Sequence, residues 1–201
     1  MSGQVRRAPP RTRRIMLGIF RVATGHADGL AQFGDTPEAF LGSLAPLLAF
    51  PLVGALLMLG QGQGVAALTD LLATLCALLA PAALSYEAAR LWGRAPQWTR
   101  FAVAFNWCQW AIPVLAMLLV VLAGILLTLG VPSSVGLGLG LVVAGLVGYG
   151  LWLHWFLARH GLGLGVVRAA LLVVGVNLAT VLLVLGPRLL VLALGGALPE
   201  G

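Results

Sequence analysis

Five polar side chains interrupt the long apolar stretches of this sequence, and they are the residues that could carry chemistry. An ionisable group inside a membrane span costs on the order of a few kcal/mol unless it is paired or hydrated, so such residues are functional candidates by default. With proline-kinked helices around them, they could line the cavity of a carrier. The candidate polar cluster comprises Glu87, Asn106, Gln109, His154 and Asn177.

Four of these residues also have a structural explanation, which we favour. Glu87 and Arg90 are three residues apart at a predicted helix end, where an ion pair reaching toward the headgroups accounts for both. Asn106 and Gln109 share one face of a helix, as amides that hydrogen-bond to a neighbouring helix do. His154 lies among aromatic residues, as an interfacial side chain would. A carrier requires these polar residues to converge around solvent.

No catalytic or metal-binding motif accompanies the polar residues. Cys76 and Cys108 lie in different apolar stretches without a CxxC pair, which argues against a zinc site and against a disulfide framework. The glycine-rich run at 161–165 follows no strand and therefore does not indicate a nucleotide-binding loop. No nucleophile is paired with a base. We expect a non-enzymatic protein with no metal site and no cofactor.

The composition requires these residues to lie in membrane-spanning helices. Of 201 residues, 60% are hydrophobic and 9% are charged, whereas the apolar share of soluble domains is about 45–50%. We predict an all-α, polytopic transmembrane helical bundle in residues 35–198, since five apolar stretches each reach the roughly 20 residues that a bilayer core requires. Proline in the first three spans predicts kinks, and Pro46 and Pro51 predict a kink or a partly unwound turn in the first. The predicted spans are residues 41–60, 65–91, 101–129, 135–158 and 164–187.

The arginines alternate between connections, and this pattern predicts the orientation. They occur in the N-terminal arm and in the connections after the second and fourth spans, whereas the other two connections have none. The positive-inside rule then predicts a cytoplasmic N-terminus and an outside C-terminus. All 12 cationic residues are arginine, which is typical of a GC-rich genome and indicates the bacterial inner membrane. The apolar tail 189–198 after Arg188 is too short to cross back, so we expect it to extend the fifth helix or to lie on the outer face.

The N-terminal segment combines a basic arm with an amphipathic helix. We predict that residues 1–13 are flexible and that residues 14–34 lie in the headgroup plane, because Ile15, Ile19 and Val22 recur at helical spacing. Anionic lipid, and not nucleic acid, is the expected counterion of the excess positive charge. The arginines expected to contact lipid headgroups are Arg6, Arg7, Arg11, Arg13, Arg14 and Arg21.

A capping signal marks the start of the first span. Asp35 or Thr36 can serve as the N-cap, and Pro37 fits the first turn. Glu38 would complete a capping box if Asp35 is the cap.

Small residues repeat every four positions along the predicted fourth span. Such a ladder allows another helix to approach closely in a membrane. It predicts a packing face, either within the bundle or between two copies of the chain. The face comprises Gly136, Gly140, Ala144 and Gly148.

The predicted topology and one sequence segment resemble a known family. A Tyr86-Glu-x-x-Arg90 turn precedes the segment 100–109, which reads Arg-Phe-Ala-Val-Ala-Phe-Asn-Trp-Cys-Gln. Together with the basic amphipathic N-terminus and five spans, this resembles small bacterial members of the Yip1 superfamily. The resemblance covers roughly residues 36–190 and implies a protein that shapes membranes or binds partners. It carries over no catalytic residue.

Two functions are consistent with these patterns. The first is a scaffold or accessory protein of the inner membrane that associates with other membrane proteins, or with itself, through the glycine face and the basic N-terminal segment. The alternative is a small transporter or channel component with a polar cavity on its cytoplasmic side.

Overall fold

The computed structural model describes residues 10–128 and 135–195, of which 126–127, 135–137 and 187–195 are described as backbone only. Within these residues the chain is helical throughout and has no strand. The elements in chain order are α1 (Arg11–Ala23), η1 (Ala27–Gln32), α2 (Pro37–Gly60), α3 (Gly64–Leu91), α4 (Ala95–Cys108), α5 (Ala111–Thr128), α6 (Val135–Gly161) and α7 (Val166–Gly195).

Five helical segments in the described part of the chain are long and apolar enough to cross a membrane. This confirms the prediction of an all-α, multi-pass membrane protein. The segments are Pro37–Gly60, Gly64–Leu91, Ala95–Ile125, Gly138–Gly161 and Val166–Gly186.

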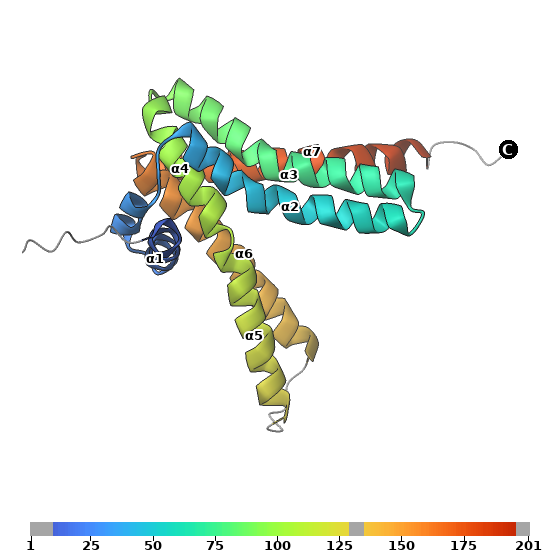
Figure 1. The fold of residues 1–201 in the computed structure, drawn as a ribbon. Helices are drawn as coiled ribbons and strands as arrows, with labels where there is room; N and C mark the ends of the chain where they lie inside the picture. Colours follow the sequence, from blue (N-terminus) through green and yellow to red (C-terminus); the bar gives the residue numbers. More distant parts are fainter. Residues whose placement is uncertain (1–9, 129–134, 196–201) are drawn as a thin grey trace, which may run out of the picture.

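The helices form two arms that diverge from a common junction (Figure 1). In one arm, α3 packs against both α2 and α7. In the other, α5 packs against α6. The junction consists of α1, η1, α4, the last turns of α6 and the first turns of α7. It therefore brings together segments that are far apart in the sequence.

Buried side chains gather at the junction. The Phe101 ring of α4 stacks on that of Phe105 at 5.9 Å. Gly161 lets α6 approach α4 closely, since a Cβ at this position would lie only 3.3 Å from Phe101. In one apolar stretch of 18 residues taken from each span, 11%, 6% and 6% of the residues are buried in the first three spans, against 28% and 22% in the fourth and fifth. Further members of this core are Val22, Leu157, Leu162, Leu172 and Val176.

The first span begins where the sequence predicts a cap. The Thr36 side chain accepts a hydrogen bond from the backbone N–H of Ala39 at 3.2 Å, with Pro37 in the first turn. Thr36 is therefore the N-cap. Asp35 instead forms an ion pair with Arg100 of α4.

The third span is divided into α4 and α5, although the sequence predicted one helix at 101–129. Pro113 has no N–H to donate to the carbonyl of Gln109, four residues earlier. That carbonyl accepts instead from the backbone N–H of Ile112 at 3.2 Å. An unwound turn thus lies in the third span, whereas α2, for which the sequence predicted a kink or a partly unwound turn, stays helical through Pro46 and Pro51.

Both ends of the chain depart from the predicted boundaries. α1 begins at Arg11, inside the arm predicted to be flexible, of which residues 1–9 lie outside the described residues. The predicted segment 14–34 is divided into α1 and η1 by a turn at Gly25, whose φ is +84°. α7 continues past the predicted end at 187 to Gly195 and includes the backbone of Arg188. Of the predicted alternatives for the tail, extension of the fifth helix is the one observed.

Candidate functional site

Three of the five predicted polar residues line one cavity, which lies where the two arms diverge. This fork cavity has a volume of about 440 Å³ and is bounded by α3, the α4–α5 break, α6 and α7. Gln109 comes from the break, His154 from α6 and Asn177 from α7. Most of the remaining lining residues are aliphatic or aromatic, including Pro81 and Phe105.

His154 and Asn177 are partners of each other at the wall of the fork cavity. The Asn177 amide nitrogen lies 3.2 Å from His154 Nδ1 and donates to the Val173 carbonyl at 2.8 Å. Because an amide nitrogen only donates, His154 Nδ1 is the acceptor in this contact. The His154 ring also packs against Phe105 at 4.6 Å. The pair therefore joins α6 to α7 as well as lining the cavity.

The other two predicted residues lie apart from the cavity. Asn106 is buried and donates to Ser43 Oγ at 2.9 Å, and Ser43 donates to the Phe40 carbonyl at 2.7 Å. This contact joins α4 to α2. Glu87 forms an exposed ion pair with Arg90 at 2.6 Å, as the structural explanation predicted. The sequence alone did not identify Ser43, because a single hydroxyl in an apolar span gives no sign of which helix it faces.

The predicted glycine face has no partner within the described part of the chain. A Cβ added at Gly140 or Gly148 would meet nothing within 4 Å, and Ala144 is exposed. Gly136 is among the residues described as backbone only. Packing within the bundle, one of the two predicted alternatives, is therefore not observed. Close contact occurs instead at Gly150, where a Cβ would lie 3.3 Å from Ile112 Cδ1.

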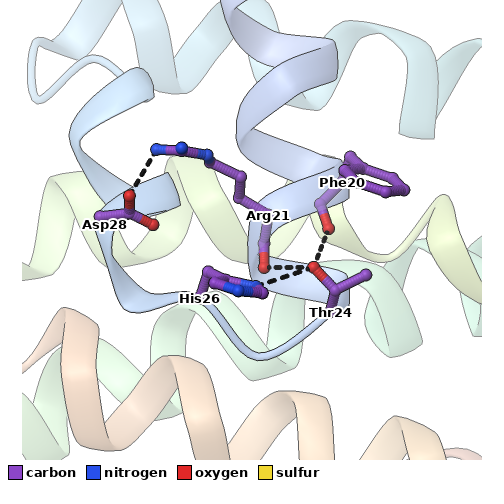
Figure 2. Close-up of polar contacts among 5 residues, drawn as sticks. All are labelled: Phe20, Arg21, Thr24, His26 and Asp28. Atoms are coloured by element: carbon purple, nitrogen blue, oxygen red, sulfur yellow. Dashed lines mark hydrogen bonds and ion pairs between the residues drawn. The ribbon is translucent and has the colours of Figure 1, made fainter.

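The N-terminal segment is folded back on itself and fixed to the junction. Figure 2 shows the turn after α1, in which the Thr24 hydroxyl donates to the Phe20 carbonyl at 2.9 Å and lies 3.1 Å from His26 Nδ1. Arg21 and Asp28 form an ion pair across this turn (Figure 2). Gly18 of α1 allows this close packing, because a Cβ at its position would lie only 2.9 Å from the Phe33 ring.

A hydrogen bond from α6 secures the end of α1. The Tyr149 hydroxyl donates to the Ala23 carbonyl at 3.0 Å. This contact links the last turn of α1 to a membrane span. The sequence pattern did not predict it, because a single tyrosine in the middle of a span gives no sign of which helix it faces.

The arginines predicted to contact lipid headgroups differ in their partners. Arg11, Arg13 and Arg14 are exposed and form no ion pair within the described residues. Arg21 is engaged by Asp28. Arg6 and Arg7, also predicted to contact headgroups, lie outside the described residues.

The cysteines and the acidic residues form no cluster in the part of the chain that the structure describes. No group of three or more His, Cys, Asp or Glu side chains there could hold a metal ion. Cys76 is exposed and Cys108 is buried, and both are free thiols.

Comparison with known protein families, with curated proteins and with solved structures finds no match for this chain. The resemblance to the Yip1 superfamily therefore remains a prediction from the segment at 100–109 and the topology.

Proposed function

We propose that this chain is a non-enzymatic membrane protein that scaffolds or assists other membrane components by binding a membrane-spanning helix on its α5–α6 arm. The observation that carries the proposal is the open small-residue face of α6. Gly140 and Gly148 of this face have no neighbour within 4 Å of an added Cβ, and Ala144 between them is exposed. The face is therefore free to receive a helix from another chain.

Membrane physics supports this use of the face. Apolar side chains gain nothing from leaving lipid, so helices associate in a bilayer through close van der Waals packing. Small residues at every fourth position permit that approach. Glycines near the junction, such as Gly161, already have a close neighbour within the chain. The open ladder on α6 thus differs from the glycines that stabilise the fold.

The arginine distribution supports an orientation with the junction in the cytoplasm. Every arginine side chain that the structure describes lies on α1, near the α3–α4 turn or near the α6–α7 turn. With five spans, the positive-inside rule gives a cytoplasmic N-terminus and an outside C-terminus. We assign the protein to the bacterial inner membrane, with α1 in the headgroup plane. This topology and function agree with those implied by the Yip1 resemblance.

The test compares two equally open glycines on different helices. Gly140→Leu places a large side chain on the proposed face, whereas Gly54→Leu does so on α2, where an added Cβ also meets nothing within 4 Å. After extraction with native lipids, we expect the wild type and Gly54→Leu to have an assembly mass larger than one chain. Gly140→Leu should have the mass of one chain. Intact assembly of Gly140→Leu would refute the proposal.

A carrier or channel component is a second candidate, favoured by the fork cavity. Gln109, His154 and Asn177 converge there beside a broken helix, as in transporters with discontinuous spans. Against it, the cavity wall is largely apolar, and Asn106 bonds elsewhere to Ser43. Proton flux into liposomes under an imposed potential, read with a pH-sensitive dye, would support this function only if Gln109→Leu abolished it.

A further inference from the structure

A polar pocket and an apolar groove meet beneath α1, on a different side of the molecule from the fork cavity. The polar pocket has a volume of about 340 Å³ and contains Arg11 and Arg14 of α1 in its wall. The apolar groove has a volume of about 670 Å³ and runs between α1 and α5, with Met16 on one side and Leu118 on the other. Trp107 belongs to the walls of both. The two cavities are therefore neighbours that meet at Trp107.

The charges in the polar pocket call for an anion. Arg11 and Arg14 form no ion pair within the described residues. The single carboxylate of the pocket belongs to Glu38 at the start of α2, and it forms no ion pair within the described residues. Two arginines and one glutamate leave a net charge of one positive unit. Nearby Arg21 and Arg100 differ, because each already has an aspartate partner.

The groove, by contrast, has no charged residue in its wall. The α1 residues Met16 and Phe20 are 62% and 66% exposed there, and Val114 of α5 is 59% exposed. A saturated hydrocarbon chain would cover these surfaces, and each methylene buried in this way favours binding. The site as a whole pairs an anion-binding end with a long apolar end.

We propose that this site binds one anionic phospholipid, with its phosphate at Arg11 and Arg14 and one acyl chain in the groove between α1 and α5. A headgroup without a cation of its own matches the net charge of the pocket. A choline headgroup would place its own positive charge close to the two arginines. The bound lipid would fill the space between α1 and α5, where the chain itself provides few contacts. The inference does not depend on the assembly face of α6.

The first test removes equal charges from neighbouring positions on α1. Native mass spectrometry of the full chain in detergent would measure binding of phosphatidylglycerol and of phosphatidylcholine with the same acyl chains. We expect tighter binding of phosphatidylglycerol, weakened about five-fold by Arg14→Gln. Arg13→Gln, which removes a charge outside the pocket wall, should leave the affinity within about two-fold. Equal losses for the two variants would indicate unspecific attraction and overturn the proposal.

The second test blocks the groove without changing charge. Ala111→Phe adds a ring to the groove wall, whereas Val120→Phe adds one to α5 outside it. We expect only Ala111→Phe to lose the bound phosphatidylglycerol, with both variants keeping the wild-type melting temperature. Unchanged binding by Ala111→Phe would overturn the proposal. So would displacement of the lipid by glycerol 3-phosphate at equal concentration, because an acyl chain would then contribute nothing.

Discussion

The junction and the two arms are built by different means. At the junction, side chains from α1, α4, α6 and α7 bury one another as in a soluble core, with Phe101, Leu162 and Val22 almost inaccessible. Along the arms, most large apolar side chains face outward, among them Leu56 of α2 and Leu118 of α5. The fold is therefore fixed at one end, and the surfaces left for lipid or a partner helix lie on the arms.

Polar contacts follow the same division. At or near the junction, hydrogen bonds join different helices: Asn106 reaches Ser43, and Tyr149 reaches the Ala23 carbonyl. The indole N–H of Trp98 likewise donates to Ser85 Oγ at 3.1 Å. In the arms, hydroxyls such as Thr69 bond within their own helix, here to the Val65 carbonyl at 2.9 Å. The junction should therefore determine stability, and the arms should tolerate substitution.

The largest difference is expected between two adjacent leucines of α7. Leu172 is 3% exposed in the junction core, whereas Leu171 is 61% exposed. Leu172→Ala should lower the free energy of unfolding by about 2–5 kcal/mol, because it removes buried methyl groups and leaves a cavity. Leu171→Ala should change it by less than about 1 kcal/mol. Denaturant titration in detergent measures both, and similar losses would contradict the distinction between junction and arms.

A smaller effect is expected from the buried hydrogen bond between α2 and α4. Asn106→Ala should destabilise the fold by about 1–2 kcal/mol, since it removes one partner of a buried pair. A double-mutant cycle with Ser43→Ala should give a coupling of about 0.6–1.7 kcal/mol, the range found for hydrogen bonds in membranes. The same cycle for the exposed pair Glu87–Arg90 serves as the control and should give less. A coupling of zero for Asn106 and Ser43 would show that their hydrogen bond does not stabilise the fold.

The N-terminal ends of α2 and α3 offer a comparison in which we expect an energetic effect of similar size. α2 begins at the junction with Thr36 as a side-chain cap, whereas α3 begins at the far end of its arm with Gln63, which provides none. Thr36→Ala should cost about 0.5–2 kcal/mol, because the Ala39 N–H loses its acceptor. Gln63→Ala should have almost no effect on thermal unfolding. Equal shifts in melting temperature would contradict the assignment of Thr36 as a cap.

The smallest effect is a pH dependence at the edge of the junction. The Arg100 guanidinium, hydrogen-bonded to Asp35, lowers the pKa of that carboxyl in the folded protein. The stabilisation is therefore fully present above the unfolded pKa of about 3.9 and is lost as the pH falls through the lower, folded value. The melting-temperature difference between wild type and Asp35→Asn should stay constant from about pH 7 to pH 5 and shrink below about pH 4. A difference that is as large at about pH 3 as at about pH 7 would exclude Asp35 as its source.

The sequence predicted the five spans and the Glu87–Arg90 pair, because length, hydropathy and short-range spacing determine them. It could not predict the two arms. The spans are apolar on all sides, so no stripe of polar residues indicates which faces meet. The break after Cys108 was also missed, since Pro46, Pro51 and Pro113 are equivalent as sequence signals but only the last divides a helix.

The candidate site was predicted only in part for the same reason. Gln109, His154 and Asn177 line one cavity, but the partner of Asn106 depends on how α2 packs on α4. The glycines in close contact, Gly18 and Gly161, belong to no ladder. A regular ladder is visible in a sequence, whereas a single close approach is not.

The divergence of the arms is the central claim, and a distance between them tests it most directly. Spin labels at Leu72→Cys of α3 and Leu122→Cys of α5, with the exposed Cys76 replaced by alanine, would report this distance in lipid nanodiscs. We expect the two labels to be separated by much more than the distance of about 8–10 Å between the axes of packed helices. A single short distance, as for two helices in contact, would contradict the open arms and the free face on α6.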